Sequence, residues 1–264
     1  MIDKILQEVV ARLSQDDKVA VLLSGGVDSL SVAFAANRIG KKIHGYSFHL
    51  DGQPSYDSDM AEEVCNKFHF QFTKVVVPTD NLYEDFMTLT KDYNCKKKTH
   101  YECVFPFLYV YPQIKEHEVL SGWAADGYYG ISKKAMMHYA KGPKTRFDEF
   151  RHQYFEHNNR AGYLWHNSVA EKHNKKFITP YLTEDVKQFF YDKTWEELNK
   201  PFQKHHVVNA FDEFQRFKFK KHINLQLGAG IDVLFETLLN NDKLNPKRKY
   251  KTVSGLCQSW GKKV

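Results

Sequence analysis

The feature that most constrains this chain is the stretch from Val21 to Ser29, which reads Val-Leu-Leu-Ser-Gly-Gly-Val-Asp-Ser. Its apolar start stops at Ser24-Gly25-Gly26, and apolar residues then recur at helical spacing. The stretch therefore predicts a strand, a glycine turn and the start of a helix. Such a turn exposes backbone N–H groups at the positive end of the helix, where phosphate binds well. Glycines also let an anion approach the backbone closely.

Strands and helices alternate through the first half of the chain. Apolar periodicity predicts helices over 2–15, 27–39, 57–68 and most of 80–115, with a lysine-rich interruption near 91–99, and strands over 19–23, 42–50, 71–77 and 118–121. This order predicts an α/β fold, a parallel twisted sheet with helices on both faces. After about residue 145 strand signals become sparse. We therefore expect an α/β core over 1–140 and a mostly helical part over 141–264 that completes the site.

Composition narrows the class of protein. The 264 residues carry a net charge of +6, with lysine runs at 96–98, 218–221 and 247–249, so phosphate-rich ligands suit the chain and nucleic acid is a possible partner. No apolar stretch is long enough to span a membrane, and residues 1–17 form an amphipathic pattern, not a secretion signal. The four cysteines form no CxxC pair. We expect a cytoplasmic protein with reduced thiols.

A second turn of the same kind follows the strand at 118–121. Residues 119–130 again read as strand, turn and helix, and Asp126 lies on the turn. Asp28 lies at the start of the helix after the first turn. Ligands of parallel sheets bind at the carboxyl ends of the strands. The two acids are therefore expected to hold Mg²⁺ jointly on a departing pyrophosphate and to be catalytic.

The strand ends and the two turns define the expected nucleotide site. Ser24, Gly25, Gly26 and Ser29 are expected to surround the phosphates. The full set of residues that we assign to nucleotide binding is Leu23, Ser24, Gly25, Gly26, Asp28, Ser29, Ser47, Ser121 and Gly122. The sequence therefore predicts ATP with Mg²⁺ as the cofactors.

The motif Ser-Gly-Gly-Val-Asp-Ser resembles the pyrophosphate loop of the N-type ATP pyrophosphatases, which have the adenine nucleotide alpha hydrolase-like fold. With the second turn about a hundred residues later, the chain looks like the synthetase domain of the asparagine synthetase family, which includes the β-lactam synthetases. Residues 177–182 and the pair Arg216-Phe217-Lys218 and Gly228-Ala229-Gly230 resemble later segments of that family. The resemblance covers roughly residues 15–235.

This resemblance implies an ATP-dependent ligase. A substrate carboxylate would be adenylated, pyrophosphate would leave, and ammonia or an amine would displace AMP to form an amide. Lys218 matches the family's lysine and would neutralise charge at the acyl-adenylate. The spacing from Lys218 to Gly228 is longer than in the family, so Lys220 and Lys221 are alternatives for this role. The chain begins Met-Ile-Asp and has no cysteine before Cys65, so we expect no intrinsic glutaminase activity.

Two departures from the family pattern keep other interpretations open. Trp123 and Gly127 stand where the family has acids. One alternative is an adenylating enzyme that acts on a nucleobase or tRNA, with Cys95 and Cys103 as candidates for sulfur transfer. The other alternative is a degenerate nucleotide-binding module without activity. The histidines, including His205 and His206, lack the spacing of a metal site.

Overall fold

The computed structural model describes residues 1–129, 137, 149, 161–191, 193–218 and 225–263. Its centre is a five-stranded sheet in the order β3-β2-β1-β4-β5, and every neighbouring pair is parallel. The strands are β1 (Lys18–Leu22), β2 (Lys42–Leu50), β3 (Gln71–Val77), β4 (Glu118–Ser121) and β5 (Lys176–Ile178). The chain moves outward from β1 to β3 and then returns to the other side of β1 as β4. The strand order therefore reverses between β1 and β4, where ligands of such sheets bind.

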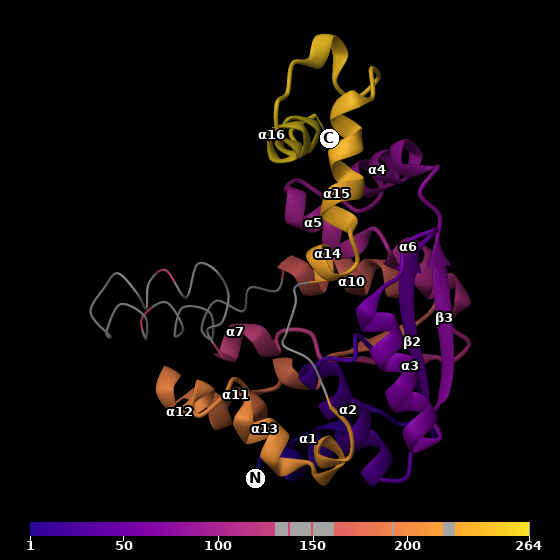
Figure 1. Cartoon of the computed structure of the whole chain (residues 1–264). Helices are drawn as coiled ribbons and strands as arrows, with labels where there is room; N and C mark the ends of the chain where they lie inside the picture. Colours follow the sequence, from indigo (N-terminus) through magenta and orange to yellow (C-terminus); the bar gives the residue numbers. More distant parts are fainter. Residues whose placement is uncertain (130–136, 138–148, 150–160, 192, 219–224, 264) are drawn as a thin grey trace.

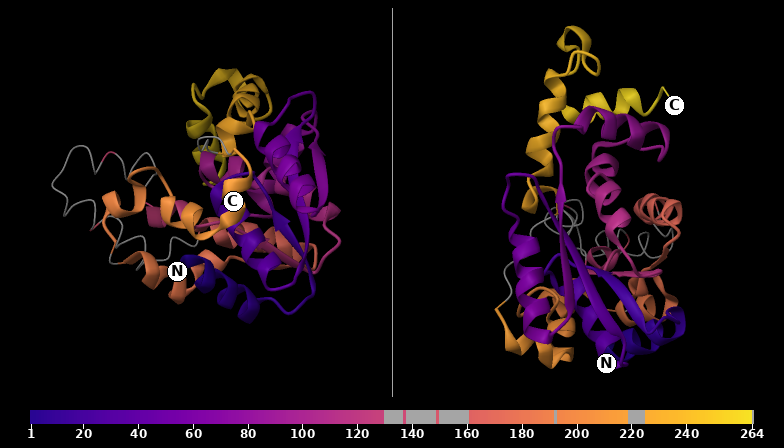
Figure 2. Two further views of the ribbon diagram at one scale, coloured as in Figure 1. Left: turned by 60° about the horizontal axis from the view of Figure 1, so that its bottom comes forward. Right: turned by 90° about the vertical axis from the view of Figure 1, so that its right-hand side faces the viewer.

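Helices cover both faces of the sheet, as the sequence predicts (Figure 2). In β1, Val19 and Val21 pack into one hydrophobic cluster, and Ala20 and Leu22 pack into another on the opposite face. The first face is covered by α1 (Ile2–Leu13), α2 (Val27–Arg38), α3 (Tyr56–Phe68), α7 (Ala125–Tyr129), α11 (Glu184–Tyr191), α12 (Trp195–Asn199) and α13 (His205–Ala210). The second face is covered by α4 (Leu82–Lys91), α5 (Lys98–Val104), α6 (Phe107–Val110), α10 (Ala161–Lys172), α15 (Ile231–Glu236) and α16 (Val253–Trp260).

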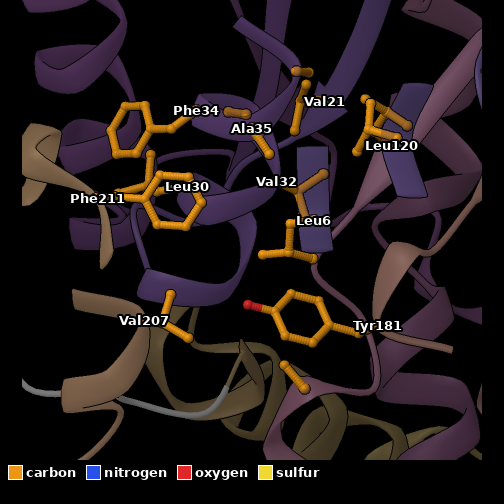
Figure 3. Packing of buried hydrophobic residues seen from close by; sticks show 14 of the residues in the cluster. Leu6, Val21, Leu30, Val32, Phe34, Ala35, Leu120, Tyr181, Val207 and Phe211 are labelled. Atoms are coloured by element: carbon orange, nitrogen blue, oxygen red, sulfur yellow. The ribbon is translucent and has the colours of Figure 1, made fainter. Parts of the chain in front are cut away.

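Helix α2 is the central helix of the first face. Its residues from Ser29 to Ala36 are all buried, so it is surrounded by other elements on every side. The Phe34 ring lies 4.9 Å from the Phe68 ring and 5.3 Å from the Phe214 ring, and Phe211 packs nearby (Figure 3). Removing the Phe34 ring would lower the free energy of unfolding by ~3–5 kcal/mol. This packing fixes the N-terminus of α2, which faces the candidate site.

The C-terminal part is mostly helical, as expected, but it also supplies a strand that the sequence pattern did not show. Strand β5 has three residues and pairs with β4, with Lys176 opposite Glu118. So short a strand carries no periodic signal, and its pairing with β4 defines it. The segment from α15 to α16 lies beside α5 (Figure 1). The sheet contains strands from both sides of residue 140, since β5 follows that position. The division of the chain at residue 140 stays a prediction.

Within the described ranges, no helix is long and apolar enough to cross a membrane.

Candidate active site at the ends of β1 and β4

The turn between β1 and α2 requires glycine at its first glycine position. Gly25 has a φ of +67°, and a Cβ there would lie 2.5 Å from Cγ of Met60. Gly26 is the N-cap residue of the 12-residue helix α2. The hydroxyls of Ser24 and Ser29 lie 3.4 Å apart across the turn. The turn therefore presents two hydroxyl groups and the positive end of a buried helix at one place, which is the arrangement that favours phosphate.

The turn after β4 packs directly onto the turn after β1. A Cβ on Gly122 would lie 2.5 Å from the backbone nitrogen of Ser29, so only glycine allows this approach. Ser121, the last residue of β4, pairs with Leu22 at the end of β1. Asp126 follows on the short helix α7. The structure thus brings together the two acid-bearing turns that the sequence separates by about a hundred residues.

A lysine that the sequence analysis did not select lies between the two acids. The ammonium group of Lys204 donates a hydrogen bond to Oδ2 of Asp28 and another, of 2.6 Å, to Oδ1 of Asp126. Lys204 is only 4% exposed. Its backbone has a φ of +63°, an unusual conformation for a residue with a side chain. The arrangement is an ion triplet in which one buried ammonium group lies between two carboxyl groups, and the Asp126 side chain is 43% exposed.

Burial and mutual charge shift the pKa values of Asp28 and Lys204. Burial raises the pKa of Asp28 to about 7; Lys204 opposes this shift and Asp126 adds to it. Burial favours the neutral form of Lys204, but the two carboxylates outweigh that effect, so the pKa of Lys204 is raised. Lys204 is therefore charged at neutral pH. Two carboxylates beside one ammonium group favour the binding of a further cation.

The two acids fit a magnesium ion that also binds phosphate. Oδ1 of Asp28 is buried and has no hydrogen-bond partner among the described residues. Carboxylate oxygens are the protein ligands that Mg²⁺ prefers, and one or two of them suffice when phosphates supply the others. No group of three or more metal-binding side chains occurs in the part of the chain that the structure describes. The geometry thus suits a metal bound together with a nucleotide.

The turns open into one cavity of about 460 Å³ at the carboxyl ends of β1, β2 and β4. Every residue that the sequence assigned to nucleotide binding lines it: Leu23, Ser24, Gly25, Gly26, Asp28, Ser29, Ser47, Ser121 and Gly122. Asp126 lines it too. The structure therefore gathers the whole predicted set, and the role of each residue stays a prediction.

The lysine chosen from the sequence lies elsewhere. Lys218 is exposed and is not among the described residues that line the cavity. Lys220 and Lys221 lie outside the described residues. Lys204 has no local sequence signal, because it reaches the acids through the packing of α13 against α1 and α2. Nothing in the pattern around residue 204 distinguishes it from the other lysines of this basic chain.

The floor of the cavity is held by a buried polar network below Tyr46. The Tyr46 hydroxyl donates to Oε2 of Glu116 at 2.8 Å, and Lys18 and His44 lie 3.0 Å and 2.9 Å from Oε1. Burial raises the pKa of Glu116, but the hydrogen bonds from His44, Lys18 and Tyr46 outweigh it and lower that pKa to about 2. Glu116 is therefore a carboxylate at neutral pH and anchors the tyrosine ring that lines the cavity.

The far wall of the cavity comes from α5, α6, α10 and α14 (Leu225–Gly228). Cys103 lines this wall and accepts a hydrogen bond of 2.9 Å from Nε2 of Gln226. Burial raises the pKa of the Cys103 thiol to about 12, and burial also raises the pKa of Cys95, which lies outside the lining. Both thiols are therefore protonated at neutral pH, which makes them weak nucleophiles.

The chain is similar in sequence to proteins of known families. Residues 1–227 match the family described as asparagine synthase. The chain is 27% identical over 241 residues to the glutamine-hydrolysing root asparagine synthetase of Pisum sativum, covering 81% of the chain and 39% of that protein. It is 33% identical over 86 residues to the 7-cyano-7-deazaguanine synthase of Alteromonas mediterranea, covering 33% of the chain and 39% of that protein. The chain thus spans about two fifths of the length of these relatives.

Two solved structures are similar over nearly the whole chain. The U34-tRNA thiolase NcsA of Methanococcus maripaludis has 18% identity and a TM-score of 0.37, with 98% of this chain and 78% of that one covered. The NH3-dependent NAD synthetase of Campylobacter jejuni has 14% identity and a TM-score of 0.37, with 99% and 90% covered. The family match spans most of the chain. The chain belongs to the asparagine synthase family.

Proposed function

We propose that the protein is an ATP-dependent ligase that adenylates a substrate carboxylate, releases pyrophosphate and then forms an amide with ammonia or an amine. The observation that carries this proposal is the meeting of two acid-bearing turns around Lys204 at the point where the strand order reverses. A site with phosphate-binding backbone, two carboxylates and a buried cation suits a polyphosphate that leaves with a metal ion.

In the first step a carboxylate oxygen of the substrate attacks the α-phosphorus of ATP. The bond from that phosphorus to the oxygen bridging to the β-phosphorus breaks, and pyrophosphate leaves. The N-terminus of α2 and the hydroxyls of Ser24 and Ser29 would bind the phosphates, with Lys204 as the fixed cation beside them. Asp28 and Asp126 would hold Mg²⁺, which offsets the charge of the pyrophosphate when bound.

In the second step the nitrogen of ammonia or an amine attacks the acyl carbon, and the bond from that carbon to the AMP oxygen breaks. The nitrogen loses a proton, and AMP takes the electron pair. AMP is a far better leaving group than the oxide or hydroxide of a free carboxylate, which is the purpose of the adenylation.

The products of ATP test this proposal. We expect incubation of the chain with ATP, Mg²⁺ and a panel of carboxylates and amines to yield AMP and pyrophosphate, identified by mass spectrometry and a pyrophosphate assay. Formation of only ADP and phosphate from ATP would contradict the assignment. Carboxylate-dependent exchange of labelled pyrophosphate into ATP would isolate the first step from the second.

A further inference from the structure

The far wall of the cavity has a chemistry different from that of the phosphate end. Its residues come from four helices and from the turn after β4: Cys103, Phe107, Trp123, His166, Gln226 and Ala229. Building on the proposed function, we propose that this wall binds the acceptor and that the acceptor is a carboxylic acid on a planar aromatic or heteroaromatic ring. The ring would stack on Trp123 and form hydrogen bonds with His166 and Gln226.

Trp123 is a fixed aromatic surface that lines the cavity. It packs against the hydrophobic clusters of both sheet faces. A Cβ on Gly162 would lie 2.5 Å from Cζ2 of its indole, so the helix α10 approaches this ring closely only because residue 162 is glycine. The Tyr163 ring lies 6.5 Å away. An indole held in one orientation loses little entropy when a planar ligand stacks on it, which favours such a ligand.

His166 offers unused hydrogen-bonding capacity beside this surface. The residue is 5% exposed, lines the cavity, and has a buried Nδ1 without a hydrogen-bond partner among the described residues. Its ring lies between Phe107, at 4.6 Å, and Phe177, at 5.7 Å. Burial lowers the pKa of His166 to about 4, so the ring is neutral at pH 7. A neutral imidazole donates one hydrogen bond and accepts another, which suits the ring nitrogens or carbonyls of a heterocycle.

The described lining provides no cation for a second carboxylate on the acceptor. The charged side chains among the described lining residues are all acids, namely Asp28, Asp57 and Asp126. An α-amino dicarboxylate would place a second carboxylate near this wall, and a buried carboxylate needs a cation as partner. The described wall offers instead a thiol, an amide, a neutral imidazole and aromatic rings. A neutral ring with one carboxylate at the reacting end matches this wall without an unpaired charge.

Calorimetry of acceptor binding tests this inference. The protein is first saturated with α,β-methylene-ATP and Mg²⁺, so that no turnover occurs, and is then titrated with pyridine-3-carboxylate, indole-3-carboxylate or L-aspartate. We expect at least one aromatic acid to bind at least tenfold more tightly than L-aspartate. Trp123→Ala should weaken that binding by about 5- to 150-fold, the range for loss of one stacked ring, and Trp123→Phe should restore most of it.

A glycine pair supplies the matched control. Gly162→Ala should displace the indole and weaken binding of the aromatic acid, whereas Gly255→Ala, in α16, adds a Cβ no closer than 3.3 Å to its neighbours and should leave it unchanged. Three results would overturn the inference. L-aspartate could bind as tightly as the aromatic acids, neither aromatic acid could bind, or Trp123→Ala could leave the affinity for the aromatic acid unchanged. Failure of α,β-methylene-ATP itself to bind would instead contradict the proposed function.

Discussion

The two ends of the cavity are built in different ways. The phosphate end consists of two continuous turns, each of which carries its strand end, its glycine and its acid within about ten residues. The acceptor wall takes Trp123 from the second of these turns and is otherwise assembled from single residues in or next to α5, α6, α10 and α14. Local motifs therefore define the chemistry of ATP, while tertiary packing defines what reacts with it. Substitutions at the two ends should consequently have separable effects.

The largest effect is expected at the phosphate end. Asp28→Asn removes a carboxylate that contacts Lys204 and whose other oxygen has no partner among the described residues. We expect turnover to fall by about 1,000-fold, because the charge that organises the site is lost. ATP affinity with Mg²⁺ should fall more than ATP affinity without Mg²⁺, which equilibrium binding with and without EDTA would measure.

The matched control for Asp28 is an exposed acid. Asp59→Asn changes an aspartate that pairs with Lys74 on the surface, and it should leave turnover unchanged. Equal activity of the Asp28→Asn variant and the unmodified protein would remove Asp28 from the mechanism. A loss of ATP affinity that is the same with and without Mg²⁺ would assign Asp28 a role in folding or phosphate binding, not in metal binding.

A smaller effect is expected from the buried lysine. Lys204→Ala should lower the turnover number by about 100-fold with a smaller change in ATP affinity, because a fixed cation acts mainly on charge that develops during the reaction. Lys218→Ala, at the lysine selected by family resemblance, is the informative partner. Its side chain is exposed, so we expect the smaller loss there. Steady-state kinetics of both variants would decide which lysine serves the site.

A result opposite to this order would be equally clear. Loss of turnover in Lys218→Ala with normal turnover in Lys204→Ala would mean that the segment around residue 218 reaches the cavity during the reaction. Lys204→Ala also leaves both acids without their shared cation, which is destabilising at Asp28 because that side chain is largely buried. Thermal unfolding with and without Mg²⁺ and α,β-methylene-ATP would separate that loss of stability from a loss of catalysis.

The sequence predicted four of the five strands, both turns and a set of residues that line one cavity, because each of these depends on neighbouring residues. An apolar run that ends in a turn with Gly25 or Gly122 predicts a strand, followed by a turn whose backbone packs closely against a neighbouring segment. Lys204, His166 and β5 depend on contacts between distant segments, and no periodicity marks them. Only a three-dimensional structure shows that Lys204 contacts both Asp28 and Asp126.

Gly122 tests the contact between the two turns. Gly122→Ala places a Cβ 2.5 Å from the Ser29 nitrogen, so the turns must move apart. We expect ATP affinity to fall by about 10-fold and the free energy of unfolding to fall by ~1–3 kcal/mol. Gly255→Ala, in α16, places its Cβ 3.3 Å from the Thr252 hydroxyl and away from the two turns, so it should leave ATP affinity unchanged. Unchanged ATP binding in Gly122→Ala would show that the two turns act independently, and the comparison between the cavity ends would lose its basis.

The smallest effect on activity is expected at the cavity floor, where pH supplies the test. The pKa of Glu116 is lowered to about 2, against about 4.3 for an ordinary glutamate. A lowered pKa stabilises the fold above the ordinary value, and that stabilisation is lost as the pH falls toward 2. We therefore expect urea unfolding to show a drop in stability between about pH 5 and pH 2.

Two glutamates at the start of β4 make this prediction specific. Hydrogen bonds from Ser14, Lys176 and the backbone outweigh burial at Glu118, whose pKa is also lowered to about 2. Glu116→Gln and Glu118→Gln should each cost ~1.5–3 kcal/mol at pH 7 and flatten the decline below pH 5. Only Glu116 holds the tyrosine of the cavity floor, so Glu116→Gln alone should also weaken binding of α,β-methylene-ATP, by a few-fold. Equal affinity of both variants for α,β-methylene-ATP would show that Tyr46 does not need Glu116 to support binding. A decline in stability below pH 5 that is as steep in Glu116→Gln as in the unmodified protein would assign the acid sensitivity to other groups.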